Sequence, residues 1–174
     1  MRLFHRVNER FVAHLGPEER AVLVGVVEAV QAMIQGEATP GFDTIPTLAR
    51  LFPPGSTTDR EIAREFAELT GEAMRTNKTK RLESLARNLA RGKIELDREE
   101  AGETVAALND VRLAVAEILG IETAEDAARI DAGRTDGPAG GPEGLEDVLV
   151  ELYVVLTVLQ ESLVQALSAV SPSH

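Results

Sequence analysis

Two charged residues interrupt helix faces that are otherwise apolar, and their chemistry suggests a site. Arg112 lies within an apolar stripe, and Glu161 interrupts the apolar wall of the last helical stretch. Burying a guanidinium is costly unless a carboxylate pairs with it and hydrogen bonds satisfy it. The sequence therefore predicts an Arg112–Glu161 salt bridge between two helices. It would lie within a buried polar cluster formed by Asn109, Arg112, Gln160 and Glu161.

This cluster has two interpretations. The stronger one is structural, because a buried ion pair can fix the register of two helices. The alternative is functional: the cluster would form a pocket for a small anion or for a side chain of a partner protein. Both stay open at this stage, because ionisable groups with perturbed pKa values occur in structural ion-pair networks as well as in functional sites.

A basic stretch could contact a negatively charged partner. Between Arg75 and Lys93 the chain has seven basic residues and one acid, Glu83. Such a run can bind a phosphate backbone, but it lacks interleaved aromatic residues and a helix-turn-helix pattern. A solvated helix face is the stronger interpretation, and a contact with a protein or a nucleic acid is the alternative. The candidate contact surface consists of Arg75, Lys78, Lys80, Arg81, Arg87 and Arg91.

Metal and hydrolase chemistry have little support in the sequence. Four glutamates recur at helical spacing between residues 61 and 72, but a di-iron bundle also needs Glu-x-x-His motifs, and none of the three histidines has that spacing. No serine has a suitable histidine and acid for a catalytic triad. We therefore expect no catalytic residues, no metal site and no cofactor.

Hydrophobic periodicity predicts a mainly α fold that would position these residues. We expect a bundle of four to five helices with a short N-terminal β-hairpin, turned at Asn8, and a third short strand at Lys93–Leu96. The stretch Leu145–Val170 is apolar almost all round and is predicted to be the centre of the bundle, with residues 17–35 and 97–119 as its neighbours. Asp97 and Glu100 form a capping-box pattern at the start of the latter.

Residues 60–91 can form one helix or two, because their two apolar stripes, one from Ile62 to Ala73 and one from Leu82 to Leu89, point in opposite directions. One long helix, kinked near Gly71, is preferred, and it would project its basic half away from the core. Short helical segments are predicted within residues 45–52 and 122–130. Residues 131–144, with five Gly and two Pro, form a predicted flexible loop.

Composition limits the class of protein. The 174 residues suit one domain, 1–174, with an aliphatic core, because only 3% are aromatic. Cysteine is absent, the net charge is −11, and no signal-peptide or membrane-span pattern is found. We expect a cytoplasmic protein with no membrane contact and no broad affinity for nucleic acid. The wide apolar helix faces are consistent with a homodimer.

Four segments in matching order carry a resemblance to a known family. They read EFAELTGEAMRTNK (Glu65 to Lys78), KIELDREEA (Lys93 to Ala101), ALNDVRLAVAEILGI (Ala107 to Ile121) and LYVVLTVLQESLVQAL (Leu152 to Leu167). Together they resemble an actinobacterial family of small proteins catalogued as domain of unknown function number two thousand and seventeen.

The resemblance implies a helical protein led by a short strand pair, without an established activity. Genes of this family tend to lie beside those for the Clp-protease adaptor ClpS and for a metalloprotease, a sulfur carrier and a cysteine synthase. This implies a protein partner in proteolysis or sulfur metabolism. The chain departs from the family pattern at Val155 and Val158, near which tryptophans are common, and near Arg81, where an Asn is common.

We therefore expect a non-enzymatic cytoplasmic protein that acts through protein contacts or in regulation. The alternative is a nucleic-acid-binding transcriptional regulator that uses Arg75 to Lys93, and an enzyme comes third.

Overall fold

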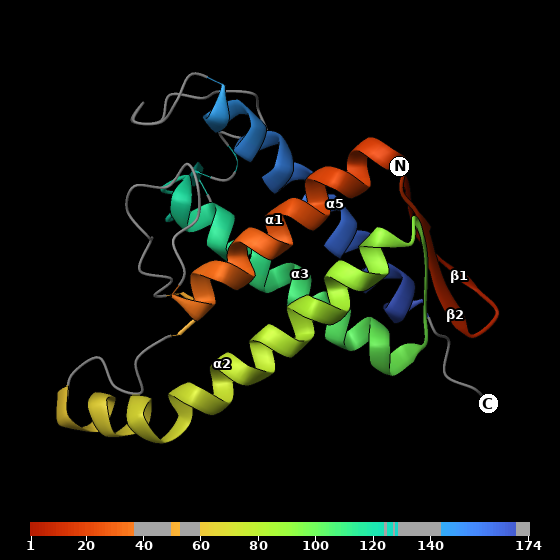
Figure 1. Cartoon of the computed structure of the whole chain (residues 1–174). Coiled ribbons are helices and arrows are strands. Elements are labelled where there is room, and N and C mark those ends of the chain that lie inside the picture. The colour runs from red at the N-terminus through yellow and green to blue at the C-terminus, as the bar shows by residue number, and fades with distance from the viewer. Residues whose placement is uncertain (37–49, 53–59, 124, 127, 129–143, 170–174) are drawn as a thin grey trace.

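The computed structural model describes residues 1–36, 50–52, 60–123, 125–126, 128 and 144–169. Four long helices and three short strands lie within this part of the chain, so the predicted mainly α class is confirmed (Figure 1). The elements are β1 (Arg2–Val7), β2 (Arg10–His14), α1 (Pro17–Gln35), α2 (Arg60–Ala90), β3 (Lys93–Leu96), α3 (Arg98–Ile118) and α5 (Leu145–Ser168).

The three strands form an antiparallel sheet in the order β1-β2-β3, which confirms the hairpin and the third strand. Asn8 turns the hairpin with a φ of 55°, in the left-handed region that asparagine enters more readily than most residues. Phe11 pairs with Leu96 and Ala13 pairs with Ile94, and all four are buried. The sheet thus presents one apolar face to the helices, at one end of the bundle (Figure 1).

Helix α1 begins and ends where the local signals predict. The Gly16 backbone N–H donates to Glu19 Oε2 at 2.7 Å, and the Met1 ammonium donates to Glu19 Oε1 at 2.5 Å. The hydrogen bond from the ammonium and the one from Gly16 lower the pKa of Glu19. Gly36 ends the helix with a φ of 77°, a conformation that costs glycine little.

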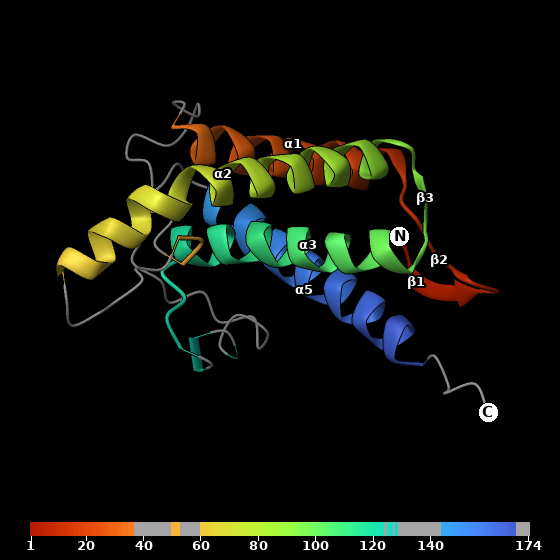
Figure 2. The same cartoon turned by 90° about the horizontal axis from the view of Figure 1, so that it is seen from below.

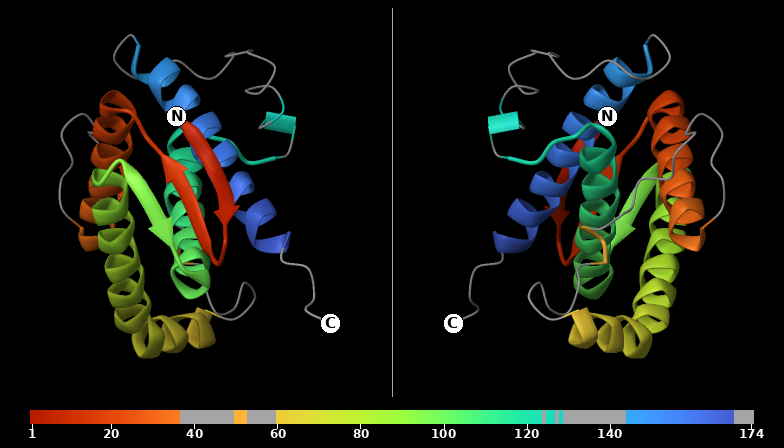
Figure 3. Two further views of the ribbon diagram at one scale, coloured as in Figure 1. Left: turned by 90° about the vertical axis from the view of Figure 1, so that its right-hand side faces the viewer. Right: turned by 90° about the vertical axis from the view of Figure 1, so that its left-hand side faces the viewer.

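Helix α3, rather than α5, is the centre of the bundle. It packs against α1, α2 and α5 and against strands β2 and β3. Its first turn has the predicted capping box: the Glu100 N–H donates to Asp97 Oδ1 at 2.9 Å, and the Asp97 N–H donates to Glu100 Oε2 at 2.8 Å. Figures 2 and 3 show α3 between the α1/α2 pair and α5.

The predicted central position of α5 is therefore wrong. Its main neighbours are α3 and β1, whereas α1 packs mainly on α2. One side of α5 remains at the surface, where Val148 and Val158 are exposed. The periodicity of α5 identified its buried leucines correctly. Of its extra valines, Val155 packs against the core, whereas Val148 and Val158 are exposed in the part of the chain that the structure describes.

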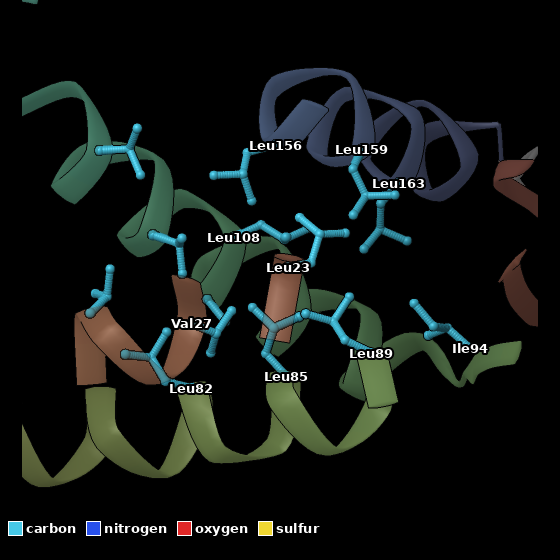
Figure 4. Close-up of a cluster of buried hydrophobic side chains, with 14 of the residues drawn as sticks. Leu23, Val27, Leu82, Leu85, Leu89, Ile94, Leu108, Leu156, Leu159 and Leu163 are labelled. Carbon is cyan, nitrogen blue, oxygen red and sulfur yellow. The ribbon is translucent and has the colours of Figure 1, made fainter. Parts of the chain in front are cut away.

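Leucines from all four helices fill the core between these elements. Figure 4 shows them pointing toward one another from α1, α2, α3 and α5. Each is at most 2% exposed, and packing of this kind supplies most of the driving force for folding. The residues labelled there are Leu23, Val27, Leu82, Leu85, Leu89, Ile94, Leu108, Leu156, Leu159 and Leu163.

Residues 60–90 form one helix, as preferred from the sequence. Its first turns, drawn in yellow, bend away from the direction of the rest (Figures 1 and 2). The expected projection of its basic half is wrong, because Leu82, Leu85 and Leu89 in that half are buried against the core. The part that extends beyond the bundle is instead the N-terminal part, where Ile62 is 55% exposed.

Some predicted segments lie outside the described residues. They include residues 45–49 and 131–143, so the predicted turns and loop there are not described. Within 122–130, residues 125, 126 and 128 are helical. Among the helices that the structure describes, none combines the length and the apolar character that a membrane span requires.

Candidate functional site

Helices α3 and α5 bring the predicted polar residues together. Arg112 from α3 and Gln160 and Glu161 from α5 line one open hollow of about 300 Å³. Val164 and Gln165 complete its wall. Asn109 lies one turn before Arg112, and its Oδ1 accepts a hydrogen bond from Arg112 Nη2 at 3.3 Å. The predicted proximity of the two helices at these residues is therefore correct.

The salt bridge predicted within this hollow is wrong. Arg112 and Glu161 form no ion pair, although the structure describes both residues, and Glu161 is exposed. Arg112 is only half-buried, so its guanidinium reaches water and does not require a carboxylate partner inside the protein. Gln160 is also half-buried, but its Oε1 atom is buried and accepts no hydrogen bond.

A buried ion pair exists elsewhere, between α2 and α3. Lys78 Nζ donates to Asp110 Oδ1 at 2.6 Å, and the carboxylate is only 4% exposed. Arg81 Nη1 lies 3.8 Å from the second carboxylate oxygen of Asp110, and Arg81 Nε donates to Glu103 Oε2 at 2.7 Å. Two cations of α2 therefore hold two acids of α3.

Sequence reasoning missed Asp110, although a signal for it was present. The apolar stripe that the sequence predicts for this helix consists of Ala101, Val105, Leu108, Val115 and Leu119, and it leaves out Ala107 and Ala114. Ala107 and Ala114 are fully buried, so the apolar face is wider on the side of Asp110. Counting small residues as core would have placed Asp110, rather than Arg112, on the buried face.

The predicted basic surface divides into two groups. Arg75 Cζ and Lys78 Nζ lie 5.5 and 5.9 Å from the centre of the Phe52 ring, within the range of cation–π attraction. Lys78 and Arg81 also hold the acids of α3. The three other residues are exposed and follow one another at steps of seven and four. They are Lys80 and Arg87 on α2 and Arg91 directly after its end.

A second surface runs along α5 beside its buried leucines, and one of its members, Val155, also packs against the edge of the core. We call it the outer face of α5. Its apolar members are Val148, which is 51% exposed, Val158, which is 37% exposed, and the half-buried Val155. All charged residues of α5 are acidic, and none is basic. The outer face consists of Asp147, Val148, Glu151, Val155, Val158 and Glu161.

The remaining candidates from the sequence do not converge on a site. His5 and His14 lie on neighbouring strands, and His174 is outside the described residues. No group of three His, Asp or Glu side chains within the described ranges is arranged to hold a metal ion.

Comparison with known proteins connects nearly the whole chain to one family. The family model described as Domain of unknown function (DUF2017) matches residues 1–167, which include every described strand and almost all of α5. No curated protein and no solved structure matches the chain.

Proposed function

The chain belongs to the family described as Domain of unknown function (DUF2017), and we propose that it is a non-enzymatic protein-interaction component. Its contact surface is the outer face of α5, and its place of action is the cytoplasm. The exposure of Val148 and Val158 beside acidic residues is the observation that supports this proposal. The protein would act as a regulator if its binding changed the activity of that partner.

The valines are spaced so that one helix of a partner can lie along them. Val148 and Val155 are seven positions apart, and Val158 follows three positions later. This is the spacing with which two helices pack side by side, each inserting side chains between those of the other. Apolar side chains at such positions lose water contact when a partner helix covers them, and this favours association.

The charges of α5 define the chemistry of that partner. The helix has four acidic residues, Glu146, Asp147, Glu151 and Glu161, and no basic residue. Opposite potentials across an interface favour the correct partner and speed the encounter. The partner proposed here is therefore an amphipathic helix with apolar residues along one face and Lys or Arg on both sides of it.

Co-purification with substituted proteins tests the proposal. Tagged wild-type protein and the double variant Val148→Lys/Val158→Lys would be expressed in the source organism. Val22→Lys on α1 is the matched control, because Val22 is 52% exposed on a different helix. We expect a partner that the wild type and the control retain, and that the α5 variant loses because lysines repel its basic side chains.

Two results would contradict this role for α5. One is a partner that all three proteins retain equally, which would place the contact elsewhere. The other is the absence of any partner that the wild type enriches over the tag alone. Circular dichroism of each purified protein would show that the substitutions leave the helical content unchanged.

The family resemblance suggests which partners to examine first. The gene neighbourhood that it implies contains the Clp-protease adaptor ClpS, a metalloprotease, a sulfur carrier and a cysteine synthase. We propose that the partner belongs to proteolysis or sulfur metabolism of an actinobacterium. Purified proteins of these two groups are therefore the first to be tested for direct binding to the outer face of α5.

A nucleic-acid-binding regulator is the second candidate function. The observation in its favour is the exposed stripe formed by Lys80 and Arg87 on α2 and by Arg91 directly after it. Three phosphate contacts would give a weak, strongly salt-dependent interaction. Fluorescence anisotropy of labelled duplex DNA at physiological ionic strength tests this candidate. An increase in anisotropy with the wild type that is smaller with Arg87→Gln/Arg91→Gln would favour it. An anisotropy that the wild type leaves unchanged would exclude it.

A further inference from the structure

The three strands are basic, although the chain as a whole has a net charge of −11. Glu95 is the one acid within them, and its Oε2 lies 2.9 Å from Lys93 Nζ. Arg2 and Arg6 form no ion pair within the described residues, so their charges are available to a partner. The strands contain four side chains that are positively charged at neutral pH, namely Arg2, Arg6, Arg10 and Lys93.

The strand register places basic side chains in one row on the outer face of the sheet. Arg2 pairs with His14, and His14 pairs with Lys93, so the three residues lie side by side across all three strands. Ala13 faces the core, and successive side chains of a strand alternate, so this row points away from the core. The left view of Figure 3 shows the strands in front of α3, and no described helix covers their other side.

Apolar side chains of β1 are exposed next to these charges. Leu3 is 37% exposed and Val7 is 44% exposed. The two residues are four positions apart on one strand, which corresponds to about 13 Å. Two turns of an α-helix span about 11 Å. The apolar stripe of one helix that lies along β1 can therefore cover both side chains.

We propose that the outer face of the sheet binds an acidic amphipathic helix of a partner protein. The apolar stripe of that helix covers Leu3 and Val7, and its carboxylates lie over the row of Arg2, His14 and Lys93. Opposite potentials favour this orientation, and packing a helix on a sheet is a common layer arrangement. The partner differs in charge from the basic helix proposed for α5, so the proposal does not depend on the role of the outer face of α5.

Two other negatively charged partners match this face less well. A single-stranded nucleic acid stacks its bases on aromatic side chains, but Phe4 and Phe11 of the sheet are buried against the core. An anionic bilayer takes up large apolar side chains from an inserted surface, whereas this face exposes only a leucine and a valine on β1. A helix with carboxylates beside an apolar stripe uses both features of the face.

Fluorescence anisotropy with a labelled synthetic peptide tests the proposal. The peptide has about 18 residues, or five helical turns, with leucines along one face and glutamates on the others. A control peptide has glutamine in place of each glutamate. We expect the wild type to bind the acidic peptide at least about fivefold more tightly than the control peptide. The affinity for the acidic peptide should fall as salt increases from about 0.05 to about 0.15 M.

Variants connect this binding to the sheet. Arg2→Gln/Lys93→Gln removes two cations of the row and should weaken binding of the acidic peptide at least about threefold. Lys80→Gln/Arg87→Gln is the matched control, because it removes the same charge from exposed positions of α2 and should leave the affinity within about twofold. Leu3→Glu/Val7→Glu should abolish binding, and circular dichroism would show that each variant is folded.

Three results would overturn the proposal. The first is the absence of binding of the acidic peptide to the folded wild type. The second is an equal loss of affinity in the two glutamine variants, which would reflect net charge alone. The third is binding of phosphatidylglycerol vesicles, but not of the peptide, that Leu3→Glu/Val7→Glu removes, because this would assign the face to a bilayer.

Discussion

Lys78 and Asp110 form the ion pair on which the contact between α2 and α3 depends most. The carboxylate is buried, and Lys78 approaches it at 2.6 Å while Arg81 lies farther away at 3.8 Å. A buried pair contributes little compared with an apolar replacement, because both charges lose hydration. Removing one partner is far more costly, because the other charge remains buried without compensation.

We therefore expect Lys78→Met to reduce the free energy of unfolding by about 2–4 kcal/mol, since Arg81 only partly replaces the lost charge. Lys80→Met, two positions away on an exposed part of the same helix, should change it by about 0.5 kcal/mol or less. Urea unfolding followed by circular dichroism measures both values.

The double variant Lys78→Met/Asp110→Leu serves as the control for this explanation. It replaces both charges by apolar groups and should recover most of the lost stability. A Lys78→Met protein as stable as the wild type would show that Asp110 reaches water and that the ion pair has no structural importance.

Helix α5 has two faces with different physical roles. Leu156, Leu159 and Leu163 on the inner side are fully buried in the core. Val148 and Val158 on the outer side keep much of their surface in water. Two adjacent positions of one helix, Val158 and Leu159, therefore belong to different environments, and this permits a direct comparison.

Leu159→Ala should reduce the free energy of unfolding by about 2–5 kcal/mol, because it removes buried methyl groups and leaves a cavity. Val158→Ala should change it by about 0.5 kcal/mol or less, because the side chain is partly in water and alanine favours the helix. Thermal and urea unfolding of the two variants give both numbers. Equal losses would mean that the outer face of α5 is covered by another part of the chain.

The elements could be predicted because their signals are local. Asn8 at the hairpin turn, the pair Asp97 and Glu100 at the start of α3, and Gly36 after α1 each act on their own few residues. The neighbours of each helix are not local properties. Periodicity shows which side of α5 is apolar, but not that β1 and α3 cover one part of it and leave Val158 exposed.

The candidate site shows the same division between local and non-local information. The sequence correctly placed Arg112 and Glu161 at one helix contact, because each interrupts an apolar stripe. It could not show that Arg112 reaches water at the edge of the hollow, since this depends on how closely α3 and α5 approach. The identity of the buried acid, Asp110, depended on alanines that contribute little to a hydrophobic stripe.

Over the whole molecule, the charge distribution limits how two copies can associate. The net charge is −11, and the homodimer suggested by the sequence remains a prediction. A symmetric dimer along the outer face of α5 would place the three acids of that face in one chain, Asp147, Glu151 and Glu161, near the same three of the other. Like charges at such an interface oppose association unless salt screens them.

We therefore expect light scattering at micromolar concentration to report monomers at low ionic strength. The dimer fraction should increase between about 0.01 and 0.15 M salt, over which the Debye length falls from about 30 to about 8 Å. A dimer that dissociates as salt is added would instead use an interface of opposite charges, with the basic stripe of α2 as the first candidate.

The hydrogen bond from the Phe4 N–H to Ser162 Oγ, at 3.2 Å, joins residues 158 positions apart in the chain. It connects the first strand to the last helix. The N-terminal hairpin therefore lacks part of its packing until α5 has been synthesised. During synthesis, the sheet and the first three helices therefore emerge with the leucines that α5 covers still facing water. Folding completes only after α5 leaves the ribosome, and contacts over such long sequence separations slow that last step.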